Sequence, residues 1–145
     1  MILPKVQKPT KADETTAYEL ATLRDNDICQ RCRRHCGPSQ RDHRKGRGVG
    51  GLTTAGNLQL LGGLNGCHLW KTDNAAEALA EGWTVPGYAD PLEWPARRWL
   101  KSAYGLRLAW VLYDDQGGVT EITESDRLER MGLVQDMTEQ RDRNG

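Results

Sequence analysis

The sequence predicts a small α+β domain built from short strands and flanking helices around a thin apolar core. Its 145 residues fit one compact domain of ordinary size. Patterns typical of helices and of short strands both occur, and no segment repeats. Apolar residues make up 37% of the chain, with five Trp and no Phe. Because 20 basic residues balance 20 acidic ones, we expect the chain to fold, and a metal site or tryptophan anchors would strengthen so thin a core.

The elements follow from local patterns along the chain. An extended arm over residues 1–9 precedes an amphipathic helix over 10–24, which carries Asp13 and Glu14 in its first turn. Residues 28–51 are rich in Cys, Gly and Arg and lack a helical period, so we expect turns and a flexible Gly-rich loop there. Short strands are predicted at 40–44 and 57–61, and a helix from 65 past 71 with a continuation that is capped at 72–73 and runs to 80. A tryptophan-anchored loop over 83–99 and a β-hairpin of 106–113 with 119–123 should follow. The predicted chain ends in a short helix, capped by Ser125 and ending at Gly132, and a frayed tail over the last dozen residues.

Charge is distributed unevenly along the chain. Residues 1–72 carry 12 Lys or Arg against 6 Asp or Glu, whereas residues 73–145 carry 8 against 14. A basic front half is typical of proteins that meet a polyanion, although a solvated charged surface would look the same. No apolar run is long enough to span a membrane, and no export signal is visible, so we expect a cytoplasmic protein whose four cysteines are thiols or metal ligands.

Two neighbouring pairs of residues could each serve two sites at once. Asp42 and His43 lie on a predicted strand, so their side chains should point to opposite faces. Cys67 and His68 lie on a predicted helix, where adjacent side chains diverge by about 100°. The earlier pair, Cys29-x-x-Cys32, has the spacing of a zinc knuckle. Each of these features alone is often structural, and it is their order along the chain that favours a functional site.

The order of these motifs resembles that of the HNH endonucleases, in the form often seen in phages of actinobacteria. The resemblance rests on Cys29-Gln-Arg-Cys32, Asp42-His43-Arg44, Asn57-Leu-Gln-Leu-Leu61 and Cys67-His68-Leu-Trp-Lys71-Thr72, and it covers about residues 20–85. It implies a ββα-metal core, in which a β-hairpin packs on a helix with a metal between them. The implied organisation is an N-terminal arm and helix over 1–24, a nuclease core over 25–85, and a Trp-rich loop, β-hairpin and acidic C-terminal segment over 86–145.

The resemblance also implies a role for each site residue. His43, Asn57 and His68 would be the catalytic residues that give the family its name. Neutral His43 could take a proton from water, and Asn57 could hold the loop bearing His43, or the imidazole itself. Asp42 and His68 would hold one divalent cation, which could be Mg²⁺, Mn²⁺, Ni²⁺ or Zn²⁺. The residues expected to contact phosphates are Arg44, Lys45, Arg47 and Lys71.

One departure from the family pattern concerns a structural zinc. The usual second cysteine pair would have a member at the position of Gly62. Cys36 is a substitute ligand and His35 a weaker one. We therefore predict a zinc bound by the four cysteines Cys29, Cys32, Cys36 and Cys67. The alternative is that the site has been lost and the knuckle cysteines pack as small apolar groups.

The function that these expectations favour is a metal-dependent endonuclease or nickase acting on double-stranded DNA. The resemblance adds a phage origin and an association with the phage terminase or another DNA-processing protein. Two other classes stay open. One is a zinc-knuckle protein that binds DNA without cleaving it, and the other is an interaction module that recruits a packaging or recombination partner. Only the nuclease requires His43.

Overall fold

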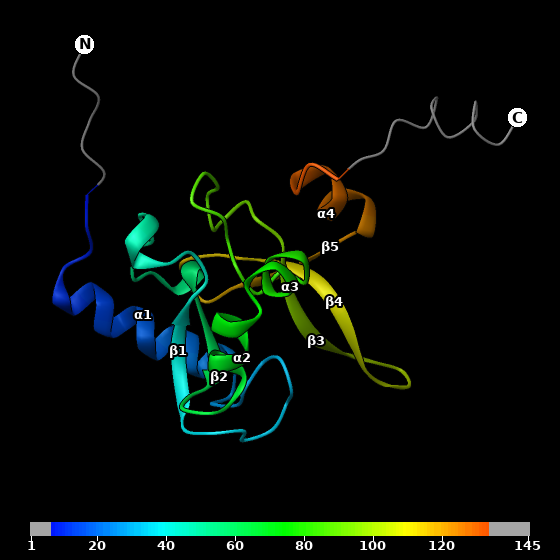
Figure 1. The fold of residues 1–145 in the computed structure, drawn as a ribbon, viewed down its shortest axis with the longest axis horizontal. Helices are drawn as coiled ribbons and strands as arrows, with labels where there is room; N and C mark the ends of the chain where they lie inside the picture. Colours follow the sequence, from blue (N-terminus) through cyan, green and yellow to red (C-terminus); the bar gives the residue numbers. More distant parts are fainter. Residues whose placement is uncertain (1–6, 134–145) are drawn as a thin grey trace, which may run out of the picture.

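The computed structural model describes residues 7–133, and within them four α helices and two antiparallel sheets form an α+β fold (Figure 1). The elements in chain order are α1 (Lys11–Arg24), β1 (Ser39–His43), the 3-10 turns η1 (Arg47–Val49) and η2 (Ala55–Asn57), β2 (Leu58–Gly62), α2 (Cys67–Asp73), α3 (Ala75–Ala80), β3 (Ala96–Ser102), β4 (Gly105–Tyr113), β5 (Val119–Ile122) and α4 (Glu124–Arg130). The predicted α+β class is therefore confirmed. The predicted frayed tail and the first six residues of the arm lie outside the described residues.

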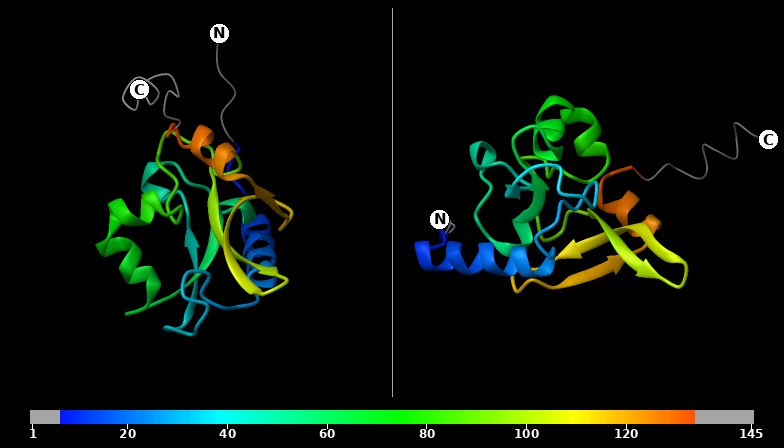
Figure 2. Two further views of the ribbon diagram at one scale, coloured as in Figure 1. Left: turned by 90° about the vertical axis from the view of Figure 1, so that its right-hand side faces the viewer. Right: turned by 90° about the horizontal axis from the view of Figure 1, so that it is seen from below.

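A two-stranded hairpin of β1 and β2 forms the centre of the fold. Its register pairs Asp42 with Gln59 and His43 with Leu58. All five residues of β2 are buried, because α1 covers one side of the hairpin while α2 and α3 lie on the other (Figure 2). Neighbouring side chains on β1 therefore face different helices.

The N-terminal helix begins where its capping residues predict. The Thr10 hydroxyl accepts a hydrogen bond from the Asp13 backbone amide, and the Asp13 carboxylate accepts one from the Thr10 amide. This reciprocal capping box satisfies two amides that the helix cannot pair internally. Buried Ala17 and Ala21 then pack on Leu58 of β2. The prediction of a helix over 10–24 is confirmed.

The C-terminal half contains one strand more than predicted. The expected hairpin is a three-stranded sheet in the order β3-β4-β5, and β3 begins inside the segment predicted to be a loop. Its sequence, Ala-Arg-Arg-Trp-Leu-Lys-Ser, lacks β-branched residues, so local propensity gives little strand signal. Seven residue pairs with β4, from Ala96↔Val111 to Ser102↔Gly105, make it a strand.

Two helix boundaries also differ from prediction. The helix predicted from residue 65 to 80 is divided at Asn74, whose backbone leaves helical geometry between α2 and α3, so the continuation is not capped by residues 72–73. The cap of α4 is Thr123, whose hydroxyl accepts a hydrogen bond from the Asp126 amide, and Ser125 lies inside the helix. Hydroxyl caps are interchangeable in sequence patterns, so the chain geometry selects between them.

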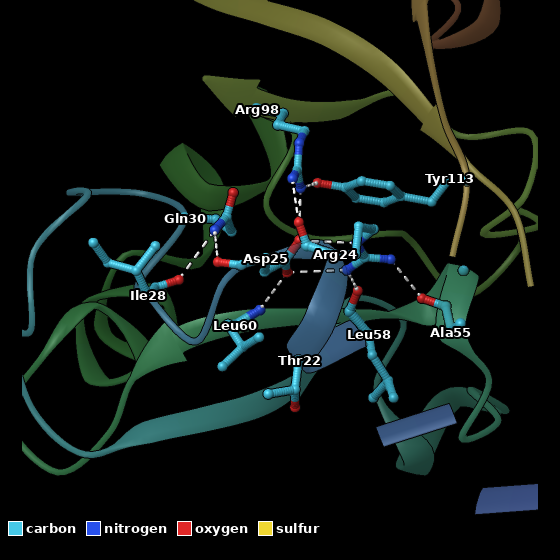
Figure 3. A network of polar contacts seen from close by, with 12 residues as sticks. Thr22, Arg24, Asp25, Ile28, Gln30, Ala55, Leu58, Leu60, Arg98 and Tyr113 are labelled. Carbon is cyan, nitrogen blue, oxygen red and sulfur yellow. Dashed lines mark hydrogen bonds and ion pairs between the residues drawn. The ribbon is translucent and has the colours of Figure 1, made fainter. Parts of the chain in front are cut away.

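A buried carboxylate joins the two sheets (Figure 3). Asp25, which is fully buried, forms ion pairs with Arg24 at 2.8 Å and with Arg98 of β3 at 2.6 Å. Its second oxygen accepts a hydrogen bond from the Leu60 amide of β2 at 3.0 Å, and its carbonyl accepts one from Gln30. One side chain thus fixes α1, the central hairpin and the C-terminal sheet to one another.

We expect Asp25→Asn to destabilise the fold by about 3–5 kcal/mol, because it leaves two buried guanidinium groups without their counter-charge. Urea unfolding of the parental protein and the variant measures the difference. Exposed Asp27 provides the matched control, and Asp27→Asn should change the free energy of unfolding by less than about 0.5 kcal/mol. Equal losses from the two variants would contradict a special role for Asp25.

Candidate functional site

The hairpin and α2 bring Asp42 and His68 together. His68 Nδ1 lies 3.1 Å from Asp42 Oδ1, yet the geometry is not that of a hydrogen bond, and this buried nitrogen has no hydrogen-bond partner among residues 7–133. Two ligand atoms bound at right angles to one cation, with bonds of 2.0–2.1 Å, would lie about 3 Å apart. The spacing of the carboxylate and imidazole therefore fits a shared divalent cation, and the chemistry of both groups suits one.

The other oxygen of Asp42 is occupied by hydrogen-bond donors. Asp42 Oδ2 accepts from Lys71 Nζ at 2.6 Å and from Gln59 Nε2 at 2.9 Å. Lys71 also donates to the His43 carbonyl at 3.0 Å, and its side chain is only 13% exposed. The Lys71 ammonium therefore lines the site beside Asp42 and does not extend from the open surface, where the expected phosphate contact would place it.

His43 points to the opposite face of β1, toward α1 and the glycine-rich loop. Its Nε2 lies 2.9 Å from the Thr53 hydroxyl and accepts a hydrogen bond from Arg47 Nε at 3.3 Å. An arginine donor at Nε2 requires that nitrogen to be unprotonated, so the ring proton sits on Nδ1. Partial burial, followed by the positive charge of Arg47, lowers the pKa of His43 below its usual 6.5. Both effects favour the neutral form of the imidazole.

Asn57 holds the loop that follows His43. This buried side chain accepts a hydrogen bond from the Lys45 amide at 2.7 Å and donates to the carbonyls of Lys45 and Leu52 at 3.0 and 2.9 Å. Both ends of the 45–52 loop are therefore tied to one amide group. Of the two expected ways for Asn57 to orient His43, the contacts match the support of the loop.

The site opens to solvent through a shallow pocket of about 410 Å³. Its lining includes the residues Arg41, Asp42, His43, His68, Lys71 and Thr84. Of the candidate catalytic residues, His43 and His68 line this pocket, whereas Asn57 does not line it and holds the loop in place. The His43 imidazole meets Thr53 and Arg47 at the edge of the site, and neither of these residues lines the pocket.

The four cysteines form a second cluster next to this pocket. The sulfur atoms of Cys29, Cys32, Cys36 and Cys67 all lie within 4.8 Å of one another, so they could hold a structural metal ion such as zinc. The turn between the first two is closed by the Arg33 amide, which donates to the Cys29 carbonyl, with Arg33 in a left-handed conformation. Neighbouring Cys67 and His68 thus face different clusters, as their helical spacing predicts.

The ionisation of the thiols differs across the cluster. Burial raises the pKa of Cys36, but hydrogen bonds from the Cys67 amide and the neighbouring thiols outweigh it and lower the value to about 7. Burial raises the pKa of Cys67 to about 12, although Arg31 donates to its sulfur at 3.6 Å. Buried thiolates need a compensating cation, and a bound metal would supply it.

Cys36 fills the space where a side chain at position 62 would lie. A Cβ atom built on Gly62 would fall 2.1 Å from the Cys36 sulfur, and one built on Gly66 would fall 2.9 Å from it. The Cys67 amide also donates to that sulfur at 3.4 Å. The Cys36 sulfur therefore lies where a cysteine at position 62 would have placed its own side chain.

Arg44 is not placed to make the phosphate contact that the sequence predicts for it. Its side chain is fully buried and donates to the carbonyls of Gly56 at 2.7 Å, Pro91 at 3.0 Å and Trp94 at 2.9 Å. Burial lowers its pKa to about 10, so the group stays charged at neutral pH. Arg44 therefore ties the 86–95 segment to the core and cannot meet DNA. Of the other predicted contacts, Lys45 is partly buried and Arg47 is exposed.

Two polar residues of the site were missed by the sequence predictions. Thr53 contacts His43, and Gln59 contacts Asp42. Gln59 carried a usable signal, because an amide inside the apolar strand Leu-Gln-Leu-Leu must find a buried partner. Thr53 carried no such signal, since a threonine after a glycine-rich loop is common and does not indicate a functional contact.

Comparison of the chain with family models, curated proteins and solved structures finds no match. Among the residues that the structure describes, no helix is both long and apolar enough to cross a membrane. The geometry of the two clusters is therefore the basis for a functional proposal.

We expect Gly62→Ala to displace Cys36 and to lower metal binding at the cysteine cluster, because the new methyl group would overlap the sulfur. Cobalt titration measures this effect through the thiolate charge-transfer absorbance of a tetrahedral site. Gly48→Ala is the matched control, since nothing lies within 4 Å of a Cβ there. Unchanged cobalt binding by Gly62→Ala would contradict the prediction that the methyl group displaces Cys36 from the site.

Proposed function

We propose that the protein is a metal-dependent DNA endonuclease or nickase of the HNH type, with a ββα-metal core formed by β1, β2 and α2. The observation that carries the proposal is the approach of His68 Nδ1 to Asp42 Oδ1 at 3.1 Å without a hydrogen bond between them. A neutral histidine, His43, follows Asp42 directly and borders the same pocket. A cation site beside a base can supply charge stabilisation and proton removal for phosphodiester hydrolysis.

In this proposal Asp42 and His68 hold one Mg²⁺, Mn²⁺, Ni²⁺ or Zn²⁺ ion. The bound cation would polarise the scissile phosphate and stabilise the leaving 3′ oxygen. One carboxylate and one imidazole leave room for water and phosphate oxygens, and the pocket has the space for them. Lys71, which also lines the pocket, donates to the other oxygen of Asp42.

His43 acts as the general base in this mechanism. Its Nε2 is the unprotonated nitrogen and takes the proton of the attacking water once that water replaces the Arg47 contact. The Arg47 side chain is 63% exposed, so it can turn from His43 toward a phosphate. Thr53 keeps its contact with the imidazole, and Asn57 keeps the loop in place.

We further propose that the cysteine cluster binds a structural zinc. Four thiolates are a ligand set that zinc prefers, and the ideal tetrahedral spacing of their sulfurs, about 3.8 Å, agrees with the observed closeness of the four. The zinc would fix Cys67 at the start of α2 and so fix His68, the next residue. In a reducing compartment the thiols remain available for the metal.

The proposed substrate is double-stranded DNA, approached by exposed arginines beside the pocket. Arg41 and Arg47 are both exposed and carry the charge that Arg44 cannot offer. A phage origin and a partner such as a terminase follow only from the family resemblance and belong to this proposal. The two other classes, a DNA-binding zinc knuckle and an interaction module, lack any need for the Asp42 and His68 arrangement.

A plasmid-relaxation assay with and without chelator tests the proposal. We expect cleavage that requires a divalent cation, and His43→Ala should lower the rate by about 10²–10⁴-fold while cation binding persists. His68→Ala should lose the cation and the activity together. Plasmid relaxation by pure His43→Ala at the parental rate would show that His43 is not the base. Tight DNA binding without cleavage under any cation would favour the zinc-knuckle alternative.

The DNA interface can be tested through salt dependence. We expect the double variant Arg41→Gln, Arg47→Gln to lower the slope of log affinity against log salt by about 2, because each lost phosphate contact removes about 0.9. Fluorescence anisotropy with a duplex in EDTA measures binding without cleavage. The matched control, Arg107→Gln with Arg130→Gln, removes the same charge from β4 and α4. An equal change of slope in the control would contradict a localised interface.

A further inference from the structure

Gln59 makes a contact that links the metal-site carboxylate to the core. Its side chain is 1% exposed and lies opposite Asp42 in the register of the central hairpin. Gln59 Nε2 donates to Asp42 Oδ2 at 2.9 Å and to the Trp83 carbonyl at 2.7 Å. Both N–H groups of this amide are therefore used, and the side chain cannot rotate without losing a buried hydrogen bond.

The two oxygens of Asp42 consequently differ. Oδ2 accepts from Gln59 and Lys71, whereas Oδ1 accepts no hydrogen bond from residues 7–133 and faces His68. A carboxylate held by one oxygen presents the other in a fixed direction. The structure thus offers a single carboxylate oxygen, already oriented, beside the imidazole nitrogen.

We propose that Gln59 is the positioning residue of the cation site: by holding Asp42 Oδ2 it aims Oδ1 at the ion shared with His68. This inference rests on the proposed function and deepens it. Lys71 also holds this oxygen, at 2.6 Å, but its ammonium would repel a cation bound at the neighbouring oxygen. Gln59 is neutral, buried and anchored to Trp83, so it orients the carboxylate without opposing the ion.

The experiment replaces the amide by a side chain of similar length and volume, Gln59→Met, in the full chain. Loss of a residue that orients a metal ligand typically lowers metal affinity 10–100-fold. We expect the dissociation constant for Mn²⁺, measured by electron paramagnetic resonance of the free ion, to rise by that factor. Mn²⁺ prefers oxygen and nitrogen ligands, so it reports on this site and not on the cysteines.

Gln30→Met is the matched control, because Gln30 is also buried and its Nε2 also donates to two oxygens, here the carbonyls of Asp25 and Ile28. Thermal unfolding of both variants measures the general cost of losing a buried amide. We expect similar losses of Tm, but a weaker Mn²⁺ affinity only in Gln59→Met. In the cleavage assay, saturating Mn²⁺ should restore most of the Gln59→Met rate, as expected for a residue that acts only through the ion.

The outcomes separate this inference from the proposed function. An unchanged Mn²⁺ affinity in folded Gln59→Met overturns the role of Gln59, whether or not the parental protein cleaves DNA. Weakened Mn²⁺ binding in that variant, with no DNA cleavage by the parental protein, supports the positioning role and contradicts the nuclease. Failure of the parental protein to bind Mn²⁺ or another divalent cation outside the cysteines overturns both.

Discussion

The buried carboxylate of Asp25 is the interaction on which the rest of the structure depends. A charged group without solvent is tolerated only when it is paired and fully hydrogen-bonded, and here Arg24, Arg98 and the Leu60 amide provide this. These partners come from α1, β3 and β2, and they can meet only in one arrangement. A chain with few large aliphatic residues thus obtains a defined packing through charge geometry in place of a larger apolar core.

Arginine side chains also join the C-terminal sheet to the rest of the fold through an aromatic ring. The Tyr113 ring of β4 lies 3.9 Å from the guanidinium group of Arg24 and 5.3 Å from that of Arg44, so cation–π contacts join the C-terminal sheet to the end of α1 and to the residue after β1. Arg44 follows His43 directly and is anchored to three carbonyls. The C-terminal segment therefore helps to fix the strand that carries the proposed base.

Residues that are adjacent in the sequence point to different parts of the site. Asp42 and His43 face α2 and α1, and Cys67 and His68 face the cysteine cluster and Asp42. Gly62 and Gly66 make this arrangement possible, since side chains there would collide with the Cys36 sulfur. A metal at the cysteines would therefore stiffen the same turn from which His68 reaches the pocket.

The sequence by itself determined the α+β class, the helix at 10–24, the opposite directions of Asp42 and His43, and the set of cysteines that gather. These features depend on local periodicity and on residue chemistry, which act over a few residues. Only the tertiary structure decided that β3 is a strand, that Arg44 is a buried anchor and that Gln59 holds Asp42. The strand β3 depends on its pairing with β4. The other two depend on partners far along the chain, since Gln59 lies 17 residues from Asp42 and Arg44 lies 50 residues from Trp94. A sequence does not distinguish an exposed arginine from a buried one. The buried arginine is hydrogen-bonded to backbone carbonyl groups, and every residue has such a group whatever its side chain.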